Sequence, residues 1–170
     1  DSFQEDWANS DKINELLSEI PFDAGTLAVT IADEMGRIQI NALVTFPESR
    51  NFNESQRLLL ERYLNYFKDD NEETPEDSQP PAIINSLKDW LDSDDFQAIT
   101  GLSGAESSYY EDLSPSYPSR NGPISDINDL LLVKGITPEL FYGSTEKPGI
   151  ASFLTVYGMK PGSGTSFTFP

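Results

Sequence analysis

Apolar residues near the start of the chain recur at helical spacing. They lie at i, i+3, i+4 and i+7 and are Ile13, Leu16, Leu17 and Ile20. This spacing places them on one face of a helix, and Pro21 predicts the end of that helix because proline interrupts helical hydrogen bonding. We expect the apolar face to dock on another part of the protein.

The next two segments have the composition of β-strands. Residues 26–32 and 37–44 are rich in aliphatic and β-branched side chains, and a short turn with a glycine separates them. We therefore expect a β-hairpin. In the second segment Ile38 and Ile40 alternate with polar residues such as Asn41, which predicts that the isoleucines face the core and Asn41 faces solvent.

Helical periodicity returns in the middle of the chain. A capping box over residues 53–56 predicts a helix over residues 54–68. Its expected apolar face consists of Leu59, Tyr63 and Tyr66. Residues 69–80 are acidic, contain proline and lack apolar side chains, so we expect a mobile loop. A second helix is predicted over residues 81–91, and its apolar face consists of Ile84, Leu87 and Leu91.

Two short helices around a glycine turn are predicted next. Residues 125–126 are suited to cap the helix INDLLLV, and Gly135 suits the turn that ends it. Thr137 is then suited to cap another helix, with Pro138 in its first turn. One more amphipathic stretch follows, marked by Ile150, Phe153, Leu154 and Tyr157.

The composition narrows the chemistry that the chain can perform. Its 170 residues are enough for a packed core, and its net charge of −18 repels nucleic acid phosphates and anionic lipid headgroups. The absence of Cys and His excludes thiol nucleophiles, Ser/His catalytic pairs and the usual zinc ligands. Only oxygen ligands remain for a metal ion.

Carboxylates crowd the segment over residues 88–112. They are Asp89, Asp92, Asp94, Asp95, Glu106, Glu111 and Asp112. Like charges at this spacing oppose one another unless a cation neutralises them, and calcium accepts about six to eight oxygens in a flexible geometry. The spacing is not that of an EF-hand, because Phe96 falls where an oxygen ligand is needed. A solvated acidic loop and a cation site both fit these residues.

Two glycines allow this segment to fold back on itself. Gly101 and Gly104 precede Glu106 and would let it face Asp92 and Asp94. The aromatic residues that flank the carboxylates are Trp90, Tyr109, Tyr110 and Tyr117. We expect these rings to pack the segment against a core.

The order of several segments resembles a known family. These segments are DWLDSDD at residues 89–95, GAE at residues 104–106 and NGPISDINDLLLVKGIT at residues 121–137. In this order they resemble the minor pseudopilin K of type II secretion systems, and the similarity extends from the start of the chain to about residue 158.

The resemblance implies an α+β fold. A pilin-like scaffold of β-hairpin and helix would be interrupted by a large inserted all-helical domain, SAM-like and containing a helix-hairpin-helix. Residues 1–52 would form the first helix and hairpin of the scaffold, residues 53–145 the inserted domain with the acidic loop, and residues 146–170 the return to the scaffold. Family members start with a hydrophobic helix and continue further, so we expect a truncated soluble fragment.

The resemblance also implies a metal site and partners. Structural calcium would be held mainly by Asp89, Asp92, Asp94 and Glu106, with Asp95, Asp112 and Asn121 as weaker candidates. Relatives often place another acid after the GAE segment, where this chain has Ser107. Minor pseudopilins I and J are the implied partners, with the major pseudopilin as a further one. The site of action would be the tip of a periplasmic pseudopilus, with the whole protein anchored in the inner membrane.

Two rival functions can be weighed on the residues. Residues 130–141 resemble a DNA-binding helix-hairpin-helix, but the net charge of −18 opposes phosphate binding. Asp94 and Glu106 could pair as a general acid and base, but a crowd of acids suits a cation better. We therefore expect no enzymatic activity. The alternative to a pseudopilin is an acidic helix-hairpin-helix binding module or a calcium-binding domain of unrelated role.

Overall fold

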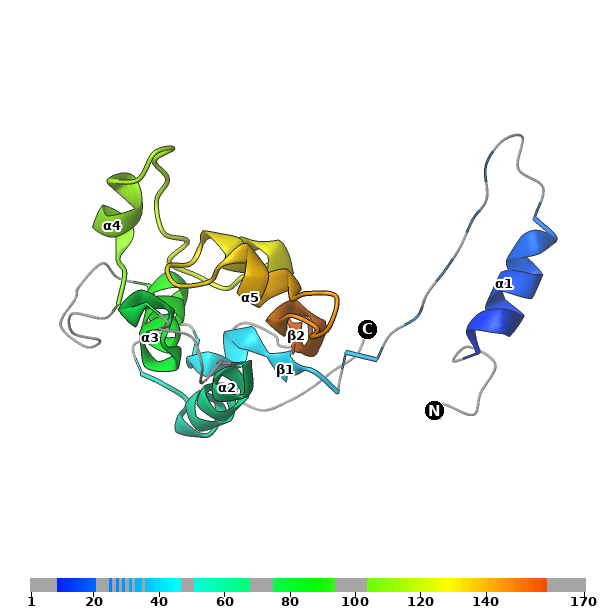
Figure 1. Ribbon diagram of the computed structural model, residues 1–170, viewed down its shortest axis with the longest axis horizontal. Helices are drawn as coiled ribbons and strands as arrows, with labels where there is room; N and C mark the ends of the chain where they lie inside the picture. The colour runs from blue at the N-terminus through cyan, green and yellow to red at the C-terminus, as the bar shows by residue number, and fades with distance from the viewer. Residues whose placement is uncertain are drawn as a thin grey trace. The chain divides into compact units, whose positions relative to one another are not determined.

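The computed structural model of the chain comprises two compact units, Asp1–Glu34 and Met35–Pro170, which are described separately (Figure 1). The residues that the structure describes are 9–20, 25, 27, 29, 31, 33–34, 36–46, 51–67, 75–93 and 104–158. Among these residues, no helix has the length and apolar character needed to cross a membrane.

The first unit contains the helix α1, Ser10–Ser18, which confirms the helix predicted from the apolar spacing. Asn9 caps it, because its side chain accepts hydrogen bonds from the backbone N–H groups of Asp11 and Lys12. No residue of α1 is buried, and Leu16 is 66% exposed. Capping and local hydrogen bonds, not core packing, therefore hold this helix.

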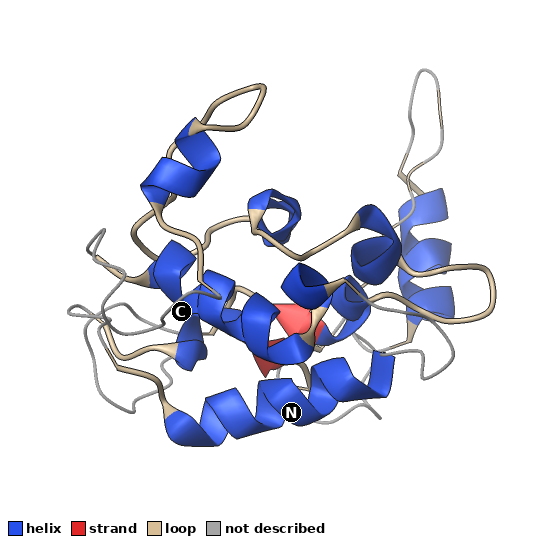
Figure 2. Cartoon of the chain, turned by 60° about the vertical axis from the view of Figure 1, so that its left-hand side comes forward, coloured by secondary structure: helices blue, strands red, loops and turns tan. Residues whose placement is uncertain are grey.

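The regular secondary structure described in the second unit is mainly helical. Helices surround a very small sheet (Figure 2). Its α-helices are α2 Glu54–Phe67, α3 Pro80–Leu91, α4 Ser107–Glu111 and α5 Pro138–Tyr142. Its 3-10 helices are η2 Ile40–Leu43, η3 Glu76–Ser78, η5 Ile127–Leu132 and η6 Ile150–Phe153. The sheet consists of β1 Ile38–Gln39 and β2 Leu154–Thr155.

The hairpin predicted from residues 26–32 and 37–44 is not found in the described part of the chain, and the strand predicted over residues 37–44 is confirmed only at Ile38–Gln39. β1 pairs in parallel with β2, with Ile38 opposite Leu154, and the chain then turns into η2. Asn41, expected at the surface, is 4% exposed. Its side-chain amide donates to the Ile124 carbonyl at 2.9 Å and its carbonyl oxygen accepts from the Ile124 N–H at 2.8 Å, so the buried polar group is satisfied. In residues 26–32, only 27, 29 and 31 are described, and none of these three lies in a strand.

The helix predicted over residues 54–68 is confirmed as α2, but its buried face differs from the prediction. Leu60 and Leu64 are buried, whereas Leu59 is 45% exposed and Tyr66 is 82% exposed. The buried stripe is the one that meets α3 and η2. Tyr63 belongs to both stripes, and its ring packs on that of Phe67 at a centroid distance of 4.9 Å.

Most of the helix α3 is buried. It begins at Pro80, one residue before the predicted start, and ten of its twelve residues are buried. It packs against α2 and η3. The loop prediction for residues 69–80 is wrong for residues 76–78, which form η3, and for Pro80, which begins α3. Residues 68–74 lie outside the described part of the chain.

The helix, glycine turn and helix predicted over residues 127–142 are confirmed as η5 and α5. Asp126 caps η5 by accepting from the Asn128 N–H, and Thr137 caps α5 by accepting from the Leu140 N–H. η5 ends at Leu132 with Val133 as its C-cap, and Gly135 takes a positive φ of +88° in the turn between η5 and α5. A Cβ at this position would lie 2.2 Å from the backbone carbonyl oxygen of Asp77, so the close approach of η3 to this turn requires a glycine.

Candidate metal centre

Two of the predicted ligands lie at the C-terminal end of α3. Asp89 belongs to its last turn, and Asp92 is the residue that caps it. Asp92 donates its backbone N–H to the Lys88 carbonyl and then leaves the helix with an extended backbone. Because residues three apart lie on one face of a helix, the two carboxylates project to the same side of α3.

The third ligand comes from the segment that leads into α4. The backbone N–H of Ala105 donates to Asp89 Oδ2 at 2.9 Å, which ties this segment to α3. Glu106 follows directly and takes an extended backbone at the start of α4. This arrangement confirms that the chain folds back to bring Glu106 towards Asp92.

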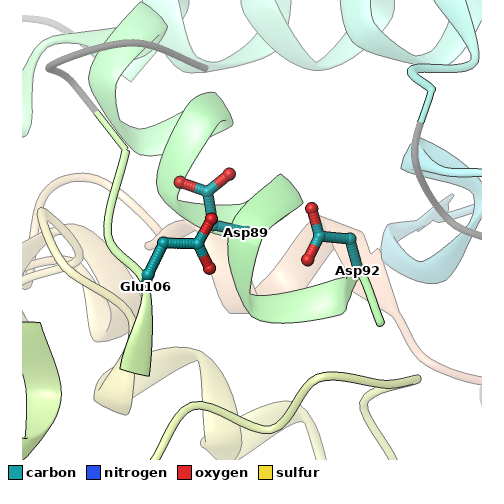
Figure 3. A group of neighbouring side chains, drawn as sticks. All are labelled: Asp89, Asp92 and Glu106. Carbon is teal, nitrogen blue, oxygen red and sulfur yellow. The ribbon is translucent and has the colours of Figure 1, made fainter. Parts of the chain in front are cut away.

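The carboxylates of Asp89, Asp92 and Glu106 form a compact buried group (Figure 3). One oxygen from each lies within 4.8 Å of the others, and the three residues are 1%, 1% and 4% exposed. Calcium–oxygen distances of about 2.3 to 2.6 Å place ligands on opposite sides of an ion up to roughly 5 Å apart. The donor set and its size therefore fit a hard divalent cation.

Lys88 lies beside this group, and it was not identified as a functional residue from the sequence. Lys88 Nζ lies 2.7 Å from Asp92 Oδ2 and 3.8 Å from Asp89 Oδ1, and its side chain is 1% exposed. A sequence signal existed, because Lys88 occupies the same helical stripe as the buried Leu87 and Leu91.

The electrostatic balance of the group is negative. The three carboxylates contribute a formal charge of −3 and the ammonium of Lys88 contributes +1, so the formal charge of the group is −2. Moreover, the C-terminal end of α3 presents carbonyl oxygens with partial negative charge, which favours cations and disfavours carboxylates there. A divalent cation would neutralise the formal charge of this buried group.

Aromatic packing holds α4 and the segment after it against α3. The ring of Tyr110 contacts that of Trp90 at a centroid distance of 4.9 Å and that of Tyr117 at 5.5 Å. Tyr110 is fully buried, and burial raises the pKa of its hydroxyl. This neutral hydroxyl accepts a hydrogen bond from the Lys134 N–H at 3.2 Å. The packing role expected of these rings is confirmed.

Asp112 and Asn121 are the remaining predicted ligands that the structure describes. Asp112 is exposed at the end of α4, and Glu111 is exposed beside it. Asn121, at a φ of 48°, accepts a hydrogen bond from the Ser119 hydroxyl, which in turn lies 2.8 Å from the Ser107 hydroxyl. Asp94 and Asp95 lie outside the described residues.

The turn at Gly135, which a DNA-binding helix-hairpin-helix would use to bind a phosphate, packs against the η3 segment of the same chain. The backbone of Asp77 lies directly against Gly135, and the Asp77 carboxylate pairs with Lys134 Nζ at 2.9 Å. A DNA phosphate would have to approach the same turn. The η3 segment therefore covers the position where such a phosphate would bind.

Comparisons with known proteins point to one family. The family model described as type II secretion system (T2SS), protein K, matches residues 36–143. The type II secretion system protein K of Aeromonas hydrophila is 32% identical over 66 residues, which are 39% of this chain and 19% of that protein.

The fold also resembles a solved structure. A chain in the crystal structure of the GspK-GspI-GspJ complex from the enterotoxigenic Escherichia coli type 2 secretion system superposes with a TM-score of 0.54 at 24% identity. The match covers 69% of this chain and 39% of that one, so this chain spans well under half of either relative. The match to the family model, over most of the second unit, shows that the chain belongs to the protein K family of the type II secretion system.

Proposed function

We propose that this chain is part of a minor pseudopilin, a non-enzymatic component that assembles with minor pseudopilins I and J at the tip of a periplasmic pseudopilus. The family match over residues 36–143 carries this proposal. The structural neighbour, which was solved in the GspK-GspI-GspJ complex, supports these two partners. Protein export across the outer membrane is the activity that the assembly would serve. In the whole protein, an N-terminal hydrophobic helix would provide an inner-membrane anchor.

A binding experiment tests the partners. The chain is mixed with the extracytoplasmic domains of pseudopilins I and J, and complex formation is followed by size-exclusion chromatography with light scattering. We expect a complex that contains all three proteins. Because the chain spans less than half of the length of its relatives, the test includes a longer protein K that contains this sequence. If that longer protein also elutes alone, the proposed assembly is wrong.

We further propose that the buried group holds a structural calcium ion, with Asp89, Asp92 and Glu106 as the ligands from the described residues. Three buried carboxylates whose oxygens lie within 4.8 Å carry this proposal. Asp94, Asp95, Asp112 and Asn121 remain further candidates for the coordination shell. The ion would join the end of α3 to the segment before α4 and supply no catalytic chemistry.

Calorimetric titration with calcium chloride tests the site after treatment with a chelator. We expect one binding event in the natural chain and its loss in Asp92→Asn and Glu106→Gln, because each change removes a charged ligand while keeping the side-chain size. Glu111→Gln is the matched control, since Glu111 is an exposed carboxylate of the same segment and is not among the candidate ligands. Binding unchanged in both buried variants would refute the site.

Thermal unfolding gives a second measurement of the same proposal. A ligand that binds only the folded state stabilises it by about 2.7 kcal/mol at a free concentration of 100 times Kd. We therefore expect calcium to raise Tm and a chelator to reverse the change. The Glu106→Gln variant should show no response to either addition.

A further inference from the structure

We infer that Lys88 acts as an internal cation that competes with calcium for Asp92, and that it thereby sets the calcium affinity of this site. The inference rests on the proposed calcium site and adds a residue that opposes ion binding. It assigns Lys88 a role in regulating calcium binding, because its ammonium contacts Asp89 and Asp92.

The position of Lys88 requires charged partners for its ammonium group. Its side chain is 1% exposed and lies on the stripe of α3 that faces the core with Leu87 and Leu91. An ammonium in such a place is strongly disfavoured unless charged partners compensate for its lost hydration. Asp92 is that partner, since Nζ lies 2.7 Å from its Oδ2, and Asp89 Oδ1 is 3.8 Å away.

The same contacts oppose a second cation. Asp92 Oδ2 is already directed at the ammonium, so an ion that uses this oxygen must share or displace that contact. The ammonium also reduces the negative formal charge of the group from −3 to −2. In addition, it repels a divalent ion at short range. When no ion is bound, however, Lys88 keeps the carboxylates from repelling one another. One residue would therefore hold the site together without calcium and weaken the binding of calcium.

The test compares calcium affinity and stability in Lys88→Met and in the natural chain. Methionine keeps the length of the apolar stem and removes the charge. We expect Lys88→Met to bind calcium roughly tenfold more tightly, which corresponds to about 1.4 kcal/mol, and to have a lower Tm than the natural chain when a chelator is present. Structural damage would weaken binding, so the expected tightening separates competition from a merely structural role.

Two controls accompany this variant. Lys147→Met removes one positive charge from an exposed lysine, and its calcium affinity should match that of the natural chain. Lys88→Arg keeps the charge at the site, and its affinity should not rise. An unchanged or weaker affinity in Lys88→Met would refute competition while leaving the calcium site intact. If neither chain binds calcium, the proposed site and the competition are both wrong.

A measurement on the natural chain covers the case in which Lys88→Met does not fold. The ammonium signal of Lys88 is observed by nitrogen-15 NMR during a titration with calcium chloride. We expect the signal to shift and its protons to exchange faster with water, because the contact with Asp92 is lost or shared. A signal that stays constant while calcium binds would overturn the inference.

Discussion

The helices α1 and α3 carry side chains at the same spacing but lie in opposite environments. Positions i, i+3, i+4 and i+7 hold Ile13, Leu16, Leu17 and Ile20 in and after α1, and Ile84, Leu87, Lys88 and Leu91 in α3. No residue of α1 is buried, whereas ten of the twelve residues of α3 are. The stripe with the charged residue is the buried one. Periodicity thus predicts a helix and its faces, but not what covers a face.

The difference arises from the rest of the second unit. α2, η3 and the segment before α4 all reach α3, and between them they cover its apolar residues and its carboxylates. Within the first unit, the described contacts of α1 include a cap at Asn9 and a hydrogen bond of 3.4 Å from the Val29 N–H to Asn14 Oδ1. The two helices therefore differ in whether their stability is local or shared with a core.

The largest expected effect comes from truncating the same residue type in each helix. Leu91 is fully buried, so Leu91→Ala should lower the free energy of unfolding by about 2 to 5 kcal/mol, through lost burial and a cavity. Leu16 is 66% exposed, so Leu16→Ala should change it by less than about 0.5 kcal/mol. Chemical denaturation followed by circular dichroism measures both. An equal cost in the two variants would show that the stripe of α1 is packed in solution.

Much of the second unit could be predicted from the sequence, because its signals are local. The capping residues Asp126 and Thr137, the turn at Gly135 and the proline at the start of α3 each act within a few residues. The strand partners could not be predicted, since β1 pairs with a segment more than one hundred residues away. Neither could the burial of Asn41, which depends on two hydrogen bonds to Ile124.

The candidate site was predictable in part for the same reason. The acids of α3 and the glycine before Glu106 indicated which carboxylates would meet, and the resemblance to the family named calcium. Composition could not separate the buried Asp89, Asp92 and Glu106 from the exposed Glu111 and Asp112, because burial depends on how α4 packs. Lys88 was overlooked because a charged residue in an apolar stripe is read as polar surface, not as a partner for buried acids.

An intermediate effect is expected from the turn that covers α3. Gly135 has a positive φ, and a Cβ there would lie 2.2 Å from the Asp77 carbonyl oxygen and 3.0 Å from Ile83 Cγ1. Gly135→Ala should therefore destabilise the protein by about 2 kcal/mol, from the left-handed backbone and the steric conflict together.

Gly36→Ala is the matched control for this change. Among the described residues, nothing lies within 4 Å of a Cβ at Gly36, and its φ lies outside the left-handed region. We expect a change within about 0.5 kcal/mol in urea denaturation. If Gly135→Ala also leaves the free energy of unfolding unchanged, then η3 does not pack closely against the turn at Gly135, and the turn does not pack closely against α3.

The smallest effects come from removing one helix cap in each unit, and they sharpen the distinction between local and shared stability. Thr137 caps α5, whose Phe141 is buried in the core, so Thr137→Ala should lower the global free energy of unfolding by about 1 kcal/mol. Asn9 caps a helix without buried residues, so Asn9→Ala should leave global unfolding unchanged and increase amide exchange only within α1. Hydrogen exchange by mass spectrometry, together with urea denaturation, separates these outcomes. A fall in global stability after Asn9→Ala would mean that α1 unfolds together with the core. Its apolar stripe would then be packed against another part of the protein, as the stripe of α3 is.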